Sequence, residues 1–429
     1  MLELWFDFSC PFAYLASRRA PRLPVAIDWR PMLLGGIFRG LGTGDGPMAT
    51  LSPAKAAHNL HDMHRWADLF GEPFRMPAGH PQRTVRALRV LLALPRERWP
   101  GAIEAIFAAY WQRGEDVTSD EVISGALRTA GVPADDIATA LRRAEDAEIK
   151  EELRRRTDEA LALGIFGAPA WIWRPPGRAP ILVWGQDRMP WIEAILAGWD
   201  PEAGPPPGGP RSFAPPPAAP GAEVTVYFDV ASPFAYFALT QLPALAATGA
   251  PVRLAPILLG ALFRDVGQAN VPLLAFPPAK LRYTQLEMGR WARWWGVPYQ
   301  MPSKFPQRTL AAQRLAILAA DEGTAAGIRL AHALGRAMWG EQRDLEDAAT
   351  LRAILAAEGF PEGWLDRTQD PALKARLAAN TAAAQEAGVF GVPTFVVHAP
   401  APGGPHLFWG QDRLDLVARA LAGHAWTPG

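Results

Sequence analysis

Cysteine is almost absent from this chain: Cys10 is the only one among 429 residues. A single cysteine excludes an intrachain disulfide and any zinc site built from several thiolates. Net charge is missing too, because 43 Lys and Arg residues balance 43 Asp and Glu residues. Without a broad basic field, neither nucleic acid nor an anionic membrane is an expected partner. Small-molecule chemistry is the better expectation.

Long apolar runs and targeting segments are also lacking. No uncharged apolar stretch approaches the ~20 residues of a membrane-spanning helix. The chain opens on LELWFDF, without the basic start and apolar core of a signal peptide, so we expect a cytoplasmic protein. There is no P-loop, dinucleotide fingerprint or HExxH motif, and nucleotide or zinc-hydrolase functions therefore have no support.

Much of the sequence occurs twice along the chain. FDFSCPFAYLAS, which starts at Phe6, returns as FDVASPFAYFAL at Phe228, and the later motifs follow in the same order. Between the copies, residues 200–221 are rich in Pro and Gly, which predicts an extended linker. The sequence predicts two domains, residues 1–199 (the first half) and residues 222–429 (the second half), each with a substantial apolar core.

The pattern within each half predicts an α/β fold. Short apolar strands are expected at Leu2–Asp7 and Val25–Trp29, and again at Val224–Asp229 and Val252–Ala255. Helical spacing of apolar residues fills most of residues 52–163, and a hairpin with a final helix from about Asp187 follows. This order predicts two tandem thioredoxin-like domains, each with an all-helical insertion.

The polar residue before the first helix differs between the halves. Pro11 and Pro233 are expected at the first turn of that helix, which places Cys10 and Ser232 at its N-terminus. Free backbone N–H groups and the helix dipole favour negative charge there. The expectation is a lowered pKa for Cys10 and a hydroxyl of Ser232 that donates to a ligand thiolate. A small buried Cys10 and an ordinary capping Ser232 are the alternative.

Neither half can form a CxxC disulfide, because Ala13 and Ala235 stand where the second cysteine would be. Pro169 and Pro393 open the third strand of each copy. If they are cis, the backbone of Ala168 or Val392 is available to pair with an extended peptide. An ordinary trans proline at the start of a strand is the alternative.

Two further sets of polar residues recur in both halves. The motif WGQDR places Gln186–Asp187 and Gln411–Asp412 at the start of the last helix, where an aspartate is either a cap or a partner for a ligand ammonium group. Lys55 and Lys280 precede His58 and Tyr283, then Arg65 and Arg290, at helical spacing. These residues can share a face that points at the site, and a solvated face is the alternative. His58, His61 and His64 correspond to Tyr283, Leu286 and Gly289 in the second half, so a metal site shared by both halves is not expected.

Both halves resemble the 2-hydroxychromene-2-carboxylate isomerases and the kappa-class glutathione transferases, within the DsbA-type thioredoxin superfamily. The resemblance rests on motifs that occur in one order in each half: D-x-x-[SC]-P-[FY]-x-Y, K-x-x-[YH]-x-x-x-[DE]-x-x-R-W-A, G-[VI]-F-G-x-P and W-G-x-D-R. It implies that glutathione binds with its sulfur at Ser232, its cysteinyl backbone beside Val392, and its γ-glutamyl end near Gln411 and Asp412.

The resemblance also implies a reaction. The serine would stabilise a glutathione thiolate that adds reversibly to an unsaturated aromatic or other electrophilic substrate, as in the isomerisation step of aromatic catabolism. The first half departs from this pattern, because Cys10 occupies the place of the serine. Since family members pair as homodimers, the two halves are expected to form an internal pseudo-dimer in a monomeric chain.

Two other functions stay open at this point. One is a glutathione-dependent monothiol oxidoreductase in which Cys10 exchanges with mixed disulfides. The other is a non-catalytic protein that binds thiols or peptides.

Overall fold

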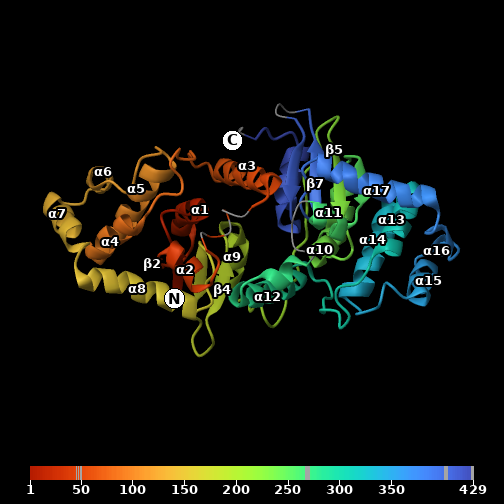
Figure 1. The fold of residues 1–429 in the computed structure, drawn as a ribbon, viewed down its shortest axis with the longest axis horizontal. Helices are drawn as coiled ribbons and strands as arrows, with labels where there is room; N and C mark the ends of the chain where they lie inside the picture. The colour runs from red at the N-terminus through yellow and green to blue at the C-terminus, as the bar shows by residue number, and fades with distance from the viewer. Residues whose placement is uncertain (45, 47, 49–50, 266–270, 401–403, 427–429) are drawn as a thin grey trace.

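The computed structural model describes residues 1–429 except 45, 47, 49–50, 266–270, 401–403 and 427–429. The two halves of the sequence lie side by side as two units of the same architecture (Figure 1). The first unit is coloured red to yellow and the second green to blue. The predicted tandem α/β fold is therefore confirmed.

Each half is built on a four-stranded mixed sheet. The strands are β1 (Leu2–Phe6), β2 (Ile27–Pro31), β3 (Ala170–Trp173) and β4 (Ile181–Trp184), and then β5 (Glu223–Phe228), β6 (Val252–Pro256), β7 (Thr394–His398) and β8 (His406–Trp409). They are ordered β2-β1-β3-β4 and β6-β5-β7-β8. The first two strands of each half pair in parallel and the other pairs are antiparallel. All of β1 is buried, in keeping with a strand that is apolar except for Glu3.

A helical insertion joins the second and third strands of each sheet, as the sequence predicts. In the first half its α-helices are α2 (Leu34–Gly40), α3 (Pro53–Phe70), α4 (Val85–Ala93), α5 (Trp99–Trp111), α6 (Asp120–Thr129), α7 (Ala134–Arg143) and α8 (Ala147–Ala162). In the second half they are α11 (Leu259–Asp265), α12 (Pro278–Trp295), α13 (Leu310–Asp321), α14 (Thr324–Trp339), α15 (Ala348–Ala357), α16 (Trp364–Arg367) and α17 (Pro371–Glu386).

Four helices lie next to the sheets and carry the site residues. They are α1 (Pro11–Arg19) and α10 (Pro233–Ala246), which follow the first strands, and α9 (Met189–Leu196) and α18 (Leu414–Leu421), which follow the last. Proline at the first position of α1 and of α10 fixes φ at a helical value, so both helices begin where the sequence predicts. The final helix begins with a 3₁₀ turn, η4 (Gln186–Arg188) or η6 (Gln411–Arg413).

Tryptophan residues of the insertion anchor the loop before each site. Trp111 and Trp339 are fully buried, as expected of core aromatics. Their indole Nε1 atoms donate to the carbonyl oxygens of Phe8 and Val230, each at 2.8 Å. The insertion therefore holds the turn between the first strand and the first helix in place.

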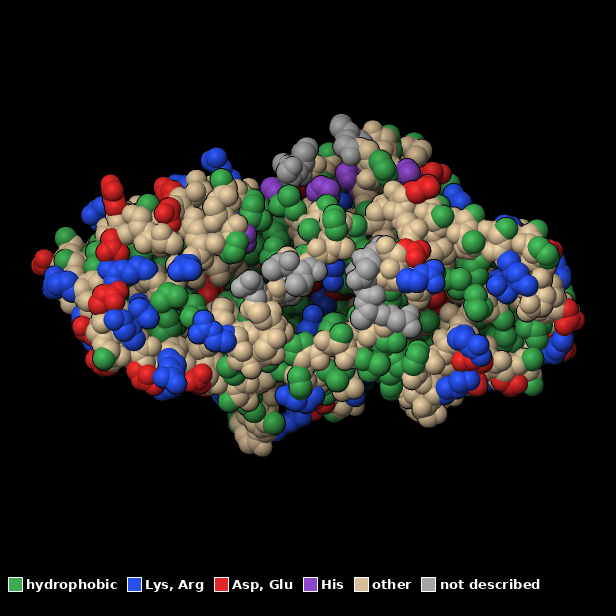
Figure 2. Space-filling model, viewed as in Figure 1, with side chains coloured by type: hydrophobic (Ala, Val, Ile, Leu, Met, Phe, Trp, Pro, Cys, Tyr) green, Lys and Arg blue, Asp and Glu red, His purple; other side chains and the backbone are tan. Residues whose placement is uncertain are grey.

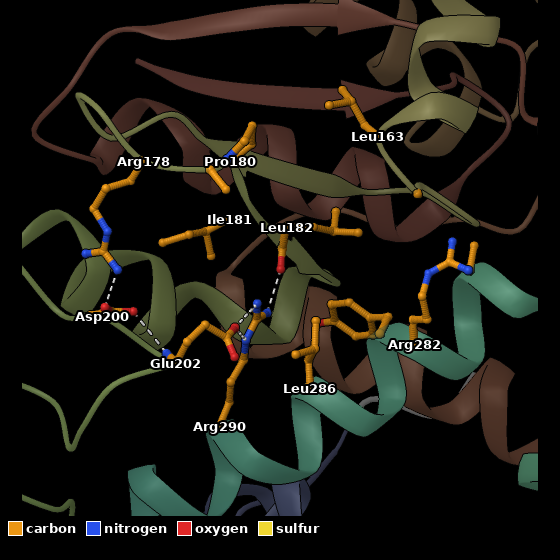
Figure 3. A pocket seen from close by; sticks show the side chains of 14 residues that line it. Leu163, Arg178, Pro180, Ile181, Leu182, Asp200, Glu202, Arg282, Leu286 and Arg290 are labelled. Carbon is orange, nitrogen blue, oxygen red and sulfur yellow. Dashed lines mark hydrogen bonds and ion pairs between the residues drawn. The ribbon is translucent and has the colours of Figure 1, made fainter.

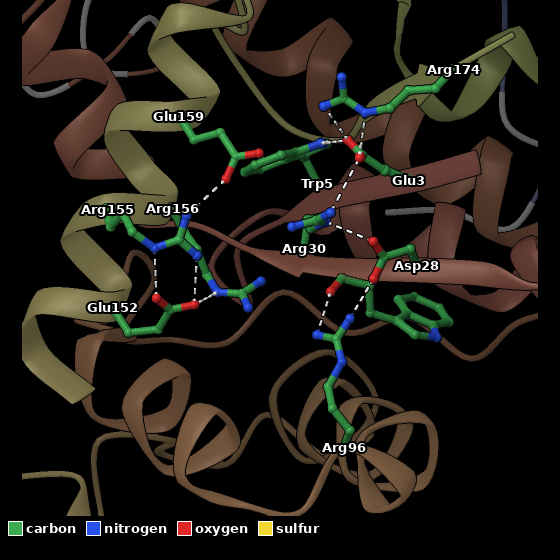
Figure 4. A network of polar contacts seen from close by, with 11 residues as sticks. Glu3, Trp5, Asp28, Arg30, Arg96, Glu152, Arg155, Arg156, Glu159 and Arg174 are labelled. Carbon is green, nitrogen blue, oxygen red and sulfur yellow. Dashed lines mark hydrogen bonds and ion pairs between the residues drawn. The ribbon is translucent and has the colours of Figure 1, made fainter. Parts of the chain in front are cut away.

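A buried carboxylate network stabilises the first sheet (Figure 4). Glu3 on β1 is fully buried, and its carboxylate accepts hydrogen bonds from Trp5 Nε1 at 2.9 Å, Arg174 Nε at 2.7 Å and Arg30 Nη2 at 3.3 Å. A buried charge is tolerated only when it is paired in this way. In the second half Thr225 takes the place of Glu3, so this network belongs to one half alone.

The segment 200–221, all of which the structure describes, forms neither helix nor strand. It packs against the second half: Phe213 is 7 % exposed and Arg211 N donates to Trp294 O at 2.7 Å.

On the face in Figure 2 acidic and basic side chains are interspersed, in keeping with the balanced composition. Among the described residues, no helix combines the length and apolar character needed to cross a membrane.

Candidate functional site

A buried aspartate fixes the turn that carries residue 10 or 232. In the second half Asp229 accepts from the backbone N of Ala231 at 3.0 Å, from Leu259 N at 2.9 Å and from Thr309 Oγ1 at 2.7 Å. Asp7 makes the matching contacts in the first half. Burial raises the pKa of both aspartates, while these hydrogen bonds act to lower it. Each carboxylate joins the site turn to the insertion.

Ser232 caps helix α10 at the edge of the second sheet. Its Oγ accepts from Ala235 N at 3.3 Å and donates to Val392 O at 3.4 Å. The side chain is 6 % exposed, so the hydroxyl lies in an enclosed position at a helix N-terminus. A hydroxyl there can donate to an anionic ligand atom that replaces the carbonyl of Val392.

Cys10 has the same place in the first half and a different environment. Its Sγ donates to Ala168 O at 3.1 Å and does not cap helix α1. Burial raises the pKa of the Cys10 thiol to about 12, and the backbone N–H groups of Ala13 and Phe12 lower it only in part. The predicted lowered pKa is therefore wrong: loss of solvent outweighs the helix terminus, and the sulfur is a buried thiol.

The prolines before the third strands are both cis. Their own carbonyl oxygens accept from the WGQDR turn: Gly185 N donates to Pro169 O at 3.0 Å and Gly410 N donates to Pro393 O at 2.9 Å. Ala168 and Val392, which precede the prolines, direct their carbonyl oxygens to residues 10 and 232. The structure thus brings together three sequence motifs that the chain separates.

The geometry of the WGQDR turn requires its glycine. Gly185 and Gly410 have φ of 109° and 110°. A Cβ on these glycines would lie 2.4 Å from Asp187 Oδ1 and 2.3 Å from Asp412 Oδ1. The aspartates fold back over the turn, so only glycine fits before them.

The glutamines of this turn have buried amide groups. Gln186 is 3 % exposed and Gln411 is 1 % exposed. Trp295 Nε1 donates to Gln411 Oε1 at 2.7 Å, which fixes that amide. The Nε2 atoms of both glutamines are buried without a hydrogen-bond partner among the described residues. A ligand carboxylate or carbonyl is the kind of group that satisfies such donors.

Asp187 and Asp412 form ion pairs at the junction of the halves. Arg413 Nη1 lies 2.8 Å from Asp187 Oδ2 and 3.1 Å from Asp412 Oδ2. Arg188 lies 3.0 Å from Asp187 and 2.8 Å from Asp412. Burial alone would raise the pKa of Asp412, but Arg413 and Arg188 hold it below its ordinary value. Asp412 is therefore an ionised carboxylate, the form that a ligand ammonium group requires.

Lys55 and Lys280 have aromatic partners and no ion pair with a described residue. Lys55 Nζ lies 5.1 Å from the centre of the Trp409 ring, and Lys280 Nζ lies 4.2 Å from the centre of the Phe276 ring. Burial lowers the pKa of Lys55. Burial and the nearby charge of Lys55 lower the pKa of Lys280 to about 8. Both amines are suited to pair with a ligand carboxylate.

The sequence expectation is a shared face that points at the site; in the structure, the other residues on these helix faces contact the last strand of the opposite half. Trp409 N donates to His58 Nε2 at 3.2 Å, and Trp184 N donates to Tyr283 OH at 2.9 Å. Arg65 Nη1 donates to Leu407 O and Arg290 Nη1 to Leu182 O, each at 2.6 Å. Each long helix, α3 or α12, therefore binds the last strand of the other half (Figure 1).

Sequence reasoning missed four charged residues of this junction. Asp62 pairs with Arg413 at 3.0 Å, and Glu287 pairs with Arg188 at 2.8 Å. All four belong to motifs visible in the sequence. The sequence did carry a signal for these pairs. An acidic residue recurs in the K-x-x-[YH]-x-x-x-[DE] motif and an arginine recurs in the W-G-x-D-R motif, and the two have opposite charge.

A cavity of about 600 Å³ lies between the first-half hairpin and α12 (Figure 3). Arg290 and Leu182 line it, and Glu202 from the linker pairs with Arg290 at 2.6 Å. None of the residues 10, 169, 232 and 393 lines this cavity, so it is separate from the two candidate sites.

Comparison with known proteins places the chain in a family. The DSBA-like thioredoxin domain matches residues 1–197 and again 223–422. Glutathione S-transferase kappa 1 of Rattus norvegicus is 28% identical over 209 residues, which cover 46% of this chain and 90% of that protein. A 2-hydroxychromene-2-carboxylate isomerase of Pseudomonas putida is 30% identical over 208 residues, which cover 46% of this chain and 93% of that protein.

Among solved structures, a 2-hydroxychromene-2-carboxylate isomerase is 22% identical, covers 46% of this chain and 94% of its own, and has a TM-score of 0.40. Each curated relative thus matches about one half of this chain along most of its own length. The chain belongs to the DSBA-like thioredoxin domain family and carries that domain twice, with kappa-class glutathione transferases and 2-hydroxychromene-2-carboxylate isomerases as its relatives.

Proposed function

We propose that this protein is a glutathione-dependent isomerase whose working site lies in the second half. The observation that carries the proposal is the position of Ser232, at the N-terminus of α10 with Oγ directed to the carbonyl beside cis-Pro393. The names of the relatives point the same way, since they include glutathione transferases and isomerases.

The residues around Ser232, together with Lys55 of the first half, fit glutathione group by group. Ser232 offers a donor to the thiolate, and the backbone of Val392 lies beside it for the cysteinyl unit. The buried Nε2 of Gln411 needs an acceptor, which the γ-glutamyl carboxylate provides, and Asp412 suits its ammonium group. Lys280 and Lys55 suit the glycyl carboxylate. Ala168, Pro169, Gln186 and Asp187 form the corresponding set beside Cys10.

The chemistry follows from what this site stabilises. Glutathione, when bound, would supply a thiolate that adds reversibly to an unsaturated aromatic substrate and allows rotation about a former double bond. Ser232 and the N-terminus of α10 stabilise negative charge on sulfur and so raise the thiolate fraction at neutral pH. Asp412 and the lysines hold the two ends of the peptide, which fixes the sulfur in one position.

The first half has a supporting role in this proposal. A thiol whose pKa is raised to about 12 is poorly suited to thiol exchange at neutral pH, which counts against a monothiol oxidoreductase based on Cys10. We propose further that residues 1–199 and 222–429 act as two domains of a monomeric chain. The reciprocal contacts of α3 and α12 support an internal pseudo-dimer. A cytoplasmic role in aromatic catabolism fits the substrate class.

Turnover of an aryl-substituted unsaturated pyruvate, followed by absorbance, tests the proposal. The isomerisation rate should rise with glutathione and saturate, and S-methylglutathione should inhibit without replacing it, because its sulfur cannot form a thiolate. An equal rate without glutathione would contradict the proposed function. Binding of glutathione without turnover of any such substrate would favour the non-catalytic alternative.

A further inference from the structure

Four charged side chains of the two WGQDR turns meet where the halves join. We call this set, Asp187, Arg188, Asp412 and Arg413, the central cluster. Each arginine lies within 3.1 Å of both aspartates. The two candidate sites therefore share one group of charges, and each half supplies an arginine to the aspartate of the other.

Arg188 of the first half is held rigidly in this cluster. Its Nε and Nη2 donate to Glu287 Oε1 at 3.0 Å and 2.8 Å. Its guanidinium lies 5.5 Å from the ring centre of Trp191 and 4.9 Å from that of Trp291. Burial alone would lower the pKa of Arg188, but Asp187 and Glu287 keep it well above its ordinary value. A stacked, doubly bonded guanidinium has little freedom to move.

The charge of Arg188 is directed into the second-half site. Its Nη2 lies 2.8 Å from Asp412 Oδ2, a carboxylate that is 18 % exposed and so reachable by a ligand. The same turn is joined to the site by the hydrogen bond from Gly410 N to Pro393 O. The position of the Asp412 carboxylate therefore depends on Arg188, a residue from the other half of the chain.

We propose that Arg188 positions Asp412 to receive the ammonium group of a ligand bound at Ser232, so that the second-half site is incomplete without the first half. This inference rests on the proposed function. Without Arg188, Oδ2 of Asp412 loses its partner from the opposite half and keeps only Arg413, at 3.1 Å, so the carboxylate is held from one side alone. The first half therefore contributes the guanidinium of Arg188 to the second-half site, and this contribution does not depend on any reactivity of Cys10.

Calorimetric titration with two ligands tests the inference. Glutathione carries the γ-glutamyl ammonium group, whereas cysteinylglycine, used as its N-acetyl derivative, has neither the γ-glutamyl end nor an ammonium group. Arg188→Gln should raise the Kd of glutathione about tenfold or more and leave the Kd of cysteinylglycine within about twofold. Asp412→Asn should do the same, and the double variant should lose no more than Asp412→Asn alone, because both residues act through one contact.

Two controls separate positioning from structural damage. Arg188→Gln combined with Glu287→Gln leaves no unpaired buried carboxylate and carries the same prediction, and Arg188→Lys should restore part of the glutathione affinity. Arg290→Gln removes a buried arginine that contacts Leu182 O and Glu202 and should not discriminate between the ligands.

Each outcome has a distinct meaning. Unchanged glutathione binding in Arg188→Gln, or equal loss of both ligands in the Arg188→Gln, Glu287→Gln variant, overturns the inference alone. Absence of glutathione binding by the wild-type protein overturns the proposed function and this inference with it.

Discussion

The two halves of this chain share one scaffold and differ at the atom that matters most for chemistry. In both, a buried aspartate ties the site turn to the insertion, a tryptophan donates to the preceding loop, and a cis proline accepts from the last turn. In one, Ser232 caps its helix; in the other, Cys10 leaves its helix uncapped and is a buried thiol. The shared fold therefore fixes where residue 10 or 232 lies, and the identity of that residue decides its reactivity.

The two halves also differ in the buried polar side chains that stabilise their sheets. The first half stabilises β1 through the buried carboxylate of Glu3. In the second half Gln313 bridges β5 and β6 instead, with Nε2 donating to Phe228 O at 2.8 Å and Ile257 O at 2.9 Å. Leu88 is its counterpart in the first half. The halves reach the same backbone arrangement with different polar groups, so variants can be matched across them.

The largest expected difference concerns the thiol of Cys10. Since burial raises its pKa from 9.0 to about 12, the thiolate fraction at pH 8 falls about a thousandfold relative to an ordinary thiol. Alkylation by iodoacetamide, followed by mass spectrometry, should be slower by about that factor in the folded protein than in the chain unfolded in urea. Comparable rates in the two states would contradict the burial of the thiol.

Ser232→Ala should have the next largest effect. Removing the hydroxyl that stabilises the thiolate is expected to lower kcat in the glutathione-dependent assay about a hundredfold. Cys10→Ala is the matched variant and should stay within about twofold of the wild-type rate. Equal loss of activity in the two variants would contradict the assignment of the working site to the second half, because both halves would then contribute equally to turnover.

Charge pairs at the junction should differ in their stabilising effect. Burial would raise the pKa of Asp62, but Arg413 holds it below its ordinary value, whereas burial raises the pKa of Glu287 despite Arg188. Ionised Asp62 therefore stabilises the fold above its unfolded pKa, and this contribution is lost as pH falls through the folded value. Asp62→Asn should cost about 2 kcal/mol in urea unfolding at pH 7, and Glu287→Gln about half of that. Equal costs would show that the two pairs are equivalent.

The smallest effect is expected at Lys280. Its folded pKa of about 8 is below the ordinary 10.5, so the unfolded chain binds more protons between these values and wild-type stability should rise with pH across that window. Lys280→Met should raise the unfolding free energy at pH 7 by about 1 kcal/mol, remove that rise and weaken glutathione binding. Lys55→Met is the matched control, with a smaller gain expected. Destabilisation by Lys280→Met would indicate a partner for its charge.

Much of this architecture is legible in the sequence. The repeat gives two domains, and apolar runs locate the strands closely: Leu2–Asp7 is predicted and Leu2–Phe6 is observed. Pro11 and Pro233 mark the starts of their helices because the first turn is where a helix tolerates proline best. These features depend on local chain chemistry, which a sequence displays directly.

Features set by distant contacts were not predictable. The pKa of Cys10 depends on how completely the surrounding residues exclude water, which local position at a helix terminus does not reveal. The partners of Asp62 and Glu287 lie in the opposite half, and helical spacing alone cannot say whether a charged face meets solvent, the site or another domain.

The most direct test of the account is calorimetric titration of glutathione into the wild-type protein, Cys10→Ser and Ser232→Ala under reducing conditions. The account predicts one site in the second half, kept in Cys10→Ser and weakened at least about tenfold in Ser232→Ala, which loses a hydrogen bond to a charged sulfur. Undiminished binding by Ser232→Ala would contradict the central claim that the second half carries the chemistry.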